Sequence, residues 1–191
     1  MIPDGGLKAW SVVAASFMML NFDGIVFSFG LLLPTIAQQF NAGREEAALT
    51  HAILNFTAYG FAPVAAVLIT RFGHMAVTQA GVMIAVAGYL AAGVSAESAC
   101  PIYVLHCTAG FMAGFGLSLM YLAANDIICK YFDKNLGLAL GIALSGCATG
   151  AVVLSEVVYQ LNANMGLGPT LLLLGVITST GVFFTAFFDF S

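Results

Sequence analysis

The stretch Lys130–Gly146, KYFDKNLGLALGIALSG, decides the fold. It begins with two lysines, two aromatic residues and an aspartate. It continues as an apolar run in which small residues recur at every fourth position, at Gly137, Gly141 and Ser145. A helix with this spacing has a smooth face on which another helix can pack closely inside a membrane. We therefore predict a basic, water-facing connection that leads directly into a closely packed membrane helix.

The composition of the whole chain is that of a membrane protein. Of its 191 residues, 61% are hydrophobic and 7% are charged, whereas a soluble domain carries about 25% charged residues. So few charges cannot cover a water-facing surface, and we expect the lipid bilayer to surround most of the chain. The first residues, MIPDGGLKAW, lack the basic segment of a cleavable signal peptide.

Several classes of function lack their sequence signals. No basic stripe of the kind that binds nucleic acid is present. The four cysteines form no C-x-x-C pair, so we expect neither a metal centre nor a cofactor. We do not expect an enzyme either. The segment Ala143–Gly146 lacks the first glycine of the G-x-S-G motif of rhomboid proteases, and no histidine follows His106 to act as a base.

Six apolar runs are long enough to cross a bilayer, which takes roughly 20 residues. The connections between them are short and hold most of the charge. We therefore predict an all-α, polytopic membrane protein that consists of one six-helix domain, residues 1–191. The spans are expected at approximately 9–34, 48–69, 77–94, 102–125, 136–161 and 170–188.

The lysines and arginines predict the orientation of this bundle. With both termini in the cytoplasm, the cytoplasmic side holds Lys8, Arg71, Lys130 and Lys134, and the opposite side holds Arg44. Membrane proteins carry an excess of basic residues in their cytoplasmic connections. We therefore predict that both termini are cytoplasmic.

Three segments carry a resemblance to a known family: Asp4–Trp10 (DGGLKAW), Ser28–Gly30 (SFG) and Tyr131–Gly146. They resemble, in this order, the signature before the first helix, an S-F-G within that helix, and the pattern that leads into the fifth helix of the monocarboxylate transporter family, which belongs to the major facilitator superfamily. The DGGLKAW form is similar to that of fungal members. The resemblance implies a six-helix bundle that forms half of a twelve-helix transporter.

The sequence departs from this family at positions that bear on function. Phe27 stands where a family member often has a basic residue that can engage the substrate carboxylate. The second connection, Thr70–Met75, keeps Arg71 and Gly73 but lacks the acid and the second basic residue of the family pattern. The resemblance covers only the amino-terminal half of the family's twelve-helix fold. We therefore expect a divergent or truncated member.

Polar residues inside the predicted spans are the candidates for a substrate or proton pathway. A charge in the hydrocarbon region is costly and needs a reason. Asp23 falls near the middle of the first span, where the family fold lines a central cavity, and a carboxylate there can bind a proton. Asn55, one turn after His51, and Asn125 are further candidates. The alternative for Asp23 is an acid that is hydrogen-bonded to a neighbouring helix.

The basic connections supply candidates for gating and topology, namely Arg71, Lys130 and Lys134. Asp126 lies four residues before Lys130, so the simplest interpretation is an acid–base pair along one helix face. His51 and His106 stand near helix ends without a second histidine one turn away, so a metal site is not expected. Close helix packing is predicted at Gly110, Gly114, Gly137, Gly141, Ser145, Gly146 and Gly150.

The predicted function is alternating-access transport of a small, monocarboxylate-like organic anion, with a proton as candidate co-substrate. The alternative is a truncated or half-length member that does not transport by itself and acts as a membrane scaffold or pairs with another half. The expected partners are the lipid bilayer, the anion, the proton, and either a second copy or a missing carboxy-terminal half. The family implies the plasma membrane as the default location of this multi-pass protein.

Overall fold

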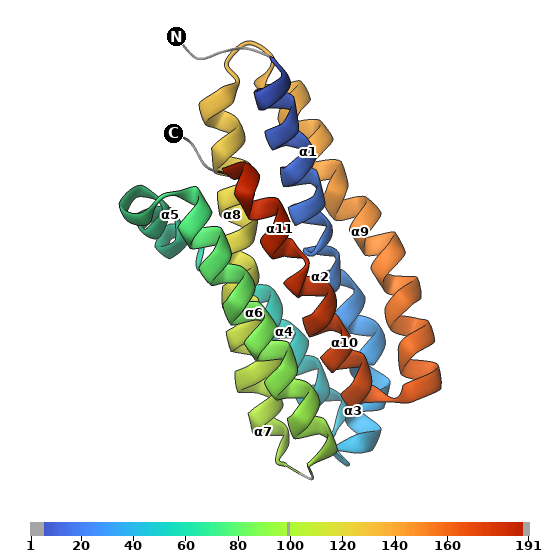
Figure 1. Cartoon of the computed structure of the whole chain (residues 1–191). Helices are drawn as coiled ribbons and strands as arrows, with labels where there is room; N and C mark the ends of the chain where they lie inside the picture. Colours follow the sequence, from blue (N-terminus) through green and yellow to red (C-terminus); the bar gives the residue numbers. More distant parts are fainter. Residues whose placement is uncertain (1–5, 99, 189–191) are drawn as a thin grey trace.

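The computed structural model of the chain describes residues 6–98 and 100–188, and every element in these ranges is helical (Figure 1). The predicted all-α fold is therefore confirmed. The elements in chain order are α1 (Leu7–Asn21), α2 (Gly24–Ser28), η1 (Phe29–Leu32), α3 (Leu33–Gln39), α4 (Arg44–Gly60), α5 (Ala62–Phe72), α6 (His74–Glu97), α7 (Ile102–Leu105), η2 (His106–Met112), α8 (Ala113–Tyr131), α9 (Leu136–Met165), α10 (Leu167–Ser179), α11 (Gly181–Thr185) and η3 (Ala186–Phe188).

Within the described residues, five helical stretches are long and apolar enough to cross a membrane. A sixth is added if the bent pair α4–α5 is taken as one span. The first stretch, Leu7–Gln39, is interrupted between α1 and α2 and again at the 3₁₀ segment η1. The stretch Ile102–Tyr131 contains the π-helical segment η2. All three irregular places lie inside spans that the hydropathy pattern presents as continuous.

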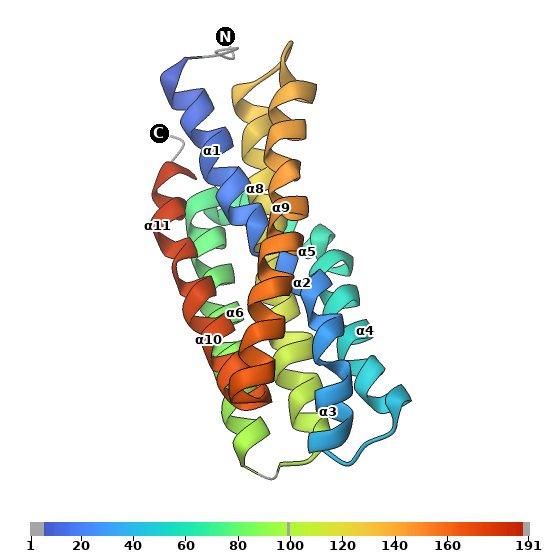
Figure 2. The ribbon, with the colours of Figure 1, turned by 90° about the vertical axis from the view of Figure 1, so that its right-hand side faces the viewer.

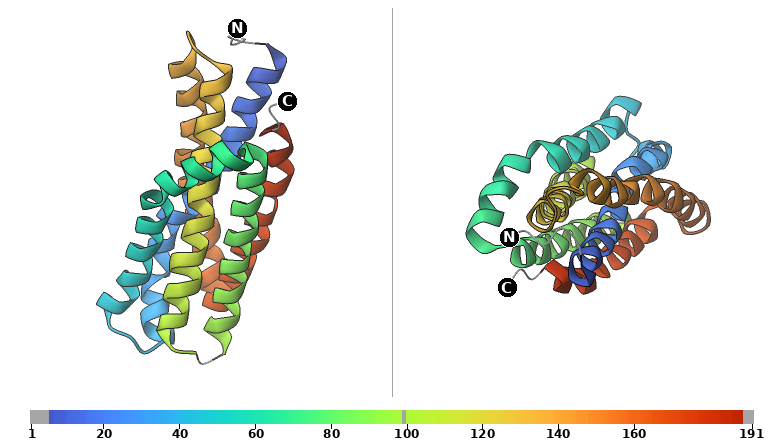
Figure 3. Two further views of the ribbon diagram at one scale, coloured as in Figure 1. Left: turned by 90° about the vertical axis from the view of Figure 1, so that its left-hand side faces the viewer. Right: turned by 90° about the horizontal axis from the view of Figure 1, so that it is seen from above.

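The predicted second span, 48–69, is bent. Its two parts, α4 and α5, meet at an angle of 43°, and α5 leans away from the other helices (Figures 1 and 3). Pro63 lies in the first turn of α5 and has no N–H group to donate to the preceding turn. Phe61 fills the bend and packs edge-to-face against Phe56, Phe111 and Phe115.

Two connections consist of one glycine each and are shorter than predicted. Gly73 separates α5 from α6, and Gly166 separates α9 from α10. Their φ angles of 81° and 82° are ones that residues with a side chain rarely adopt. A single residue therefore reverses the chain at each point.

The long helices run side by side along one axis (Figure 2). α6 packs against α8 and α10, α4 against α8, and α1 and α2 against α9. α1 begins and α11 ends at one end of the bundle, where α8 also passes into α9 (Figure 1). This end carries Lys8, Lys130 and Lys134, and Arg44 begins α4 at the opposite end.

The positions predicted for close helix packing have two kinds of surroundings in the structure. A Cβ atom on Gly110 would contact Ile53 and one on Gly114 would clash with Thr57, both of α4. A Cβ atom on Gly146 or Gly150 would clash with the backbone of α1. Gly137 and Gly141, by contrast, are exposed, with open space where a Cβ would lie, and Ser145 is exposed beside them. These three residues share a helix face that is turned away from the bundle.

Candidate functional site

The break between α1 and α2 places Asp23 inside the bundle. Its side chain is 5% exposed, and Oδ2 accepts a hydrogen bond of 2.9 Å from the hydroxyl group of Tyr59 on α4. The other carboxyl oxygen, Oδ1, is buried without a hydrogen-bond partner among the described residues. A buried acid with an unsatisfied oxygen is costly in a membrane protein. Asp23 is therefore the strongest candidate for a functional group within the spans.

Two tyrosines and a cysteine surround this acid. The rings of Tyr59 and Tyr121, which lies on α8, meet edge-to-face with centroids 5.5 Å apart. The half-buried Cys147 on α9 also faces the Asp23 carboxyl group. Four helical segments thus contribute to one polar cluster, which we call the Asp23 cluster: Asp23, Tyr59, Tyr121 and Cys147.

Asn55 and Asn125 extend this cluster along two helices. Asn55 lies one helical turn from Tyr59 on α4, and Asn125 lies one turn from Tyr121 on α8. Each amide donates to the carbonyl four residues earlier on its own helix, over 3.0 Å to His51 and 2.8 Å to Tyr121. One N–H and the side-chain carbonyl of each amide are left for other partners. The two asparagines are half-buried.

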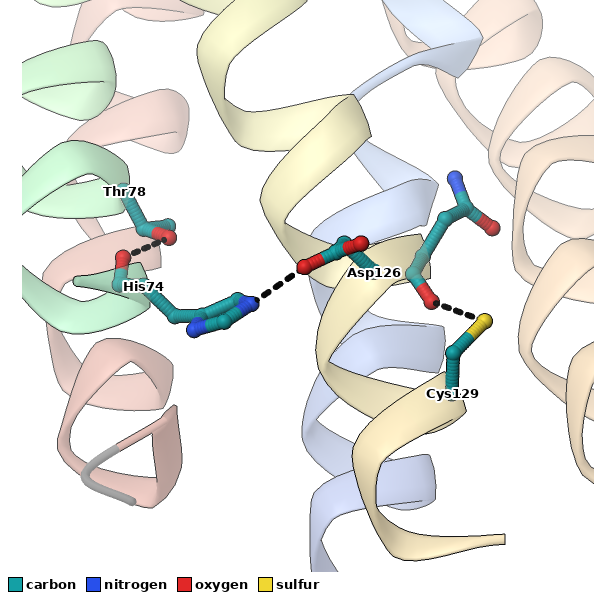
Figure 4. Close-up of polar contacts among 5 residues, drawn as sticks. His74, Thr78, Asp126 and Cys129 are labelled. Carbon is teal, nitrogen blue, oxygen red and sulfur yellow. Dashed lines mark hydrogen bonds and ion pairs between the residues drawn. The ribbon is translucent and has the colours of Figure 1, made fainter. Parts of the chain in front are cut away.

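A second polar contact joins α6 and α8 (Figure 4). His74 is the first residue of α6, and its Nε2 lies 2.7 Å from Oδ2 of Asp126 on α8. The His74 side chain is 3% exposed and that of Asp126 is 46% exposed. The contact therefore ties the start of one helix to the last turns of another, at the boundary between buried and open surroundings.

The chain is similar to curated transporters over most of its length. It is 30% identical to human "Monocarboxylate transporter 11" over 177 residues, which are 92% of this chain and 36% of that protein. It is 30% identical to mouse "Monocarboxylate transporter 3" over 174 residues, or 91% of this chain and 34% of the relative. It is 27% identical to human "Monocarboxylate transporter 7" over 186 residues, which are 97% of this chain and 35% of that protein. No protein-family model matches the chain.

The chain is homologous to the monocarboxylate transporters. The resemblance found in the sequence is thereby confirmed. The chain spans about a third of the length of the curated monocarboxylate transporters it matches. With its long apolar helices, this homology makes it a multi-pass membrane protein.

For this monocarboxylate transporter homologue, the prediction that Asp126 pairs with Lys130 is wrong. Among the described residues Asp126 pairs with His74, on another helix, rather than with Lys130. The imidazole ring of His74 reaches Asp126 from the start of α6, whereas the Lys130 side chain is exposed. Arg71 is also exposed, in the last turn of α5.

The remaining histidines join helices as well. Nε2 of His51 donates to the backbone carbonyl of Val26 over 3.0 Å, and Nδ1 of His106 lies 2.7 Å from the Thr50 hydroxyl. Both imidazole rings are thus hydrogen-bonded to protein groups. In the described residues no three His, Cys, Asp or Glu side chains are grouped as a metal site would require.

Sequence reasoning missed several residues that the structure brings to Asp23 and Asp126. Tyr59 is four residues after Asn55, and Tyr121 is four before Asn125. The spacing that placed Asn55 beside His51 could therefore have found both tyrosines. Cys147 and His74 carry no such signal, because each lies opposite its acid on a different helix.

Proposed function

We propose that this chain forms one helical bundle of a transporter for small organic anions with a single carboxylate group, driven by a proton. The observation that carries the proposal is the Asp23 cluster. It combines a buried acid, an unsatisfied carboxyl oxygen and hydrogen-bonding groups from α4, α8 and α9. The names of the homologous transporters supply the substrate class.

The buried acid supports coupling between the anion and a proton. A substrate carboxylate that approached ionised Asp23 would place two negative charges close together in surroundings with little water. Two such carboxyl groups cannot both stay ionised at short distance. The anion and a proton therefore bind together, and the proton leaves when the anion leaves.

Hydrogen bonds, rather than a cation, are proposed to hold the substrate carboxylate. The Asp23 cluster contains no lysine or arginine, and Phe27 on α2 is 56% exposed. The Tyr121 hydroxyl makes no hydrogen bond to another described residue. This hydroxyl is one available donor, and the spare N–H groups of Asn55 and Asn125 are two others.

Alternating access requires a second bundle that moves against this one. The outward face of α9 supports such a partner, because Gly137, Gly141 and Ser145 leave space for close approach of another helix. The second bundle is either another copy of the chain or a carboxy-terminal half. The distribution of lysines supports cytoplasmic termini, and the homologous transporters support the plasma membrane as the location.

Uptake by reconstituted protein tests the proposal. Proteoliposomes should accumulate labelled lactate or pyruvate above the level of empty vesicles when the outside is acidic. Asp23→Asn should abolish the dependence on the proton gradient. Glu156→Gln is the matched control, since this exposed acid on α9 is bonded to Gln160 on its own helix.

The result that would contradict transport is equally specific. Uptake at the empty-vesicle level across all gradients, with only monomers in crosslinking, would exclude transport by this bundle. It would favour a scaffold, or a role that requires a separate half.

A further inference from the structure

We infer that an anionic phospholipid binds in two adjoining hollows between α5, α6 and α8. This inference is independent of the proposed transport. One hollow has a volume of about 400 Å³ and is lined in part by His74, Gln79 and Lys130. The other has a volume of about 340 Å³. Phe72 and Ala76 line both, so the two hollows are neighbours that share a wall.

The first hollow suits a phosphate group. Lys130 is exposed on its wall and forms no ion pair with any residue in the described ranges. Gly73 and the first turn of α6 also line it, so the positive end of a 24-residue helix lies at its edge. Asp126 is not in the lining, and its carboxylate is bonded to His74 (Figure 4). Among the described residues that line this hollow, Lys130 therefore supplies a positive charge to a ligand.

The second hollow suits a hydrocarbon chain. All of its lining side chains are apolar: Leu68, Phe72, Ala76, Val77, Ala80 and Leu119. The bend of 43° between α4 and α5 carries α5, which supplies Leu68 and Phe72 to this groove, away from the other helices (Figure 3). A small hydrophilic anion would leave the groove unused. A ligand that fills both hollows has an anionic head and an apolar tail.

The position of the hollows matches the depth of lipid headgroups. Lys130 lies one residue before the end of α8, and Phe72 ends α5. The basic end of the bundle is also where Lys8 and Lys134 lie. Basic pockets between helices at the cytoplasmic side of membrane proteins bind anionic headgroups. Among membrane lipids, charge complementarity with Lys130 selects an anionic over a zwitterionic phospholipid.

Native mass spectrometry of the full chain in mild detergent tests this inference without substrate or gradient. Phosphatidylglycerol and phosphatidylcholine with identical acyl chains are compared. We expect one phosphatidylglycerol to be retained about fivefold better than phosphatidylcholine, which is the effect of one lysine near an anionic surface. Lys130→Gln should remove this preference. Lys8→Gln, which alters an exposed lysine of the same end outside the hollow, should leave it unchanged.

The tail is tested separately. Ala80→Leu should fill the groove and lower retention of both lipids, and a photoactivatable acyl chain should label α5 or α6. Glycerol phosphate, the headgroup without a tail, should not compete. Equal retention of the two lipids by the unmodified chain, or an unchanged preference in Lys130→Gln, would overturn the inference. So would effective competition by glycerol phosphate, or labelling confined to other helices. Melting curves of the exposed-site variants confirm that each is folded.

Discussion

Two faces of α9 have the same spacing of small residues and opposite surroundings. Gly146 and Gly150 are buried, and they meet the backbone of α1 so closely that a Cβ atom would clash. Gly137 and Gly141 lie on the same helix and have open space in front of them. The difference teaches that four-residue spacing creates a surface capable of close packing, whereas the neighbouring helices decide whether that surface is used.

This contrast accounts for the unusual exposure of α9. In its most apolar stretch 22% of the residues are buried, compared with 72% for the stretch that begins with α1. The buried face is tied to the first span by polar contacts: Ser28 to Ser155 over 3.0 Å, and Asn162 to Thr35 over 2.7 Å. One side of α9 is thus part of the core, and the other is available to lipid or to a second bundle.

The largest effect on stability is expected when a large side chain replaces a glycine on the buried face of α9. A Cβ on Gly150 would lie under 3.0 Å from the backbone of Asn21. Gly150→Leu should therefore destabilise the bundle by about 3 kcal/mol, the upper range for an overpacked core. Thermal unfolding in detergent measures this, with Gly141→Leu as the control at an exposed position. Equal melting temperatures of the two variants would show that the two faces do not differ.

A smaller loss of stability is expected from removing the hydrogen bond between Tyr59 and Asp23. Tyr59→Phe removes the hydrogen bond that Oδ2 of Asp23 accepts, next to an Oδ1 that already has no hydrogen-bond partner among the described residues. We expect a loss of about 1 kcal/mol, within the range measured for hydrogen bonds between membrane helices. Tyr121→Phe is the matched control, because its hydroxyl bonds no other described residue. A larger loss for Tyr121→Phe would contradict the assigned partner of Asp23.

The hydrogen bond between Ser28 of α2 and Ser155 of α9 should contribute less to stability than the bond between Tyr59 and Asp23. A double-mutant cycle with Ser28→Ala and Ser155→Ala should give a coupling energy of about 0.6 kcal/mol, the average for such pairs in membranes. Chemical denaturation of the four proteins in mixed micelles provides the values. Strict additivity of the two single changes would mean that this contact does not stabilise the packing of α2 on α9.

The smallest predicted effect has the opposite sign. Gly141→Ala adds a methyl group where nothing lies within 4 Å of it. It should stabilise the helix by roughly 0.5 kcal/mol, because alanine loses less backbone freedom than glycine. Gly150→Ala should instead destabilise the bundle, because its Cβ atom would clash with the backbone of Asn21. A destabilised Gly141→Ala in a dimer but not in a monomer would reveal a second bundle on the outward face.

The architecture could be predicted from sequence because hydropathy alone identifies the apolar stretches. Hydropathy alone does not reveal the bend at Phe61 or the interruption near Asp23, since both lie inside long apolar runs. Pro63 was a usable signal for the first, as proline cannot complete the hydrogen bonds of a continuous helix. For the site, Asp23 was recognised as a charge in an apolar run, but its partners were not, because they come from other helices.

The sequence by itself determined that the chain is a helical membrane protein. Long apolar stretches must satisfy their own backbone hydrogen bonds in lipid, and a helix does this within one segment. The tertiary structure alone decided which glycines are buried, that His74 rather than Lys130 pairs with Asp126, and that Tyr59 bonds Asp23. Spacing along a helix defines which residues share a face, but only the packing of distant segments decides what that face meets.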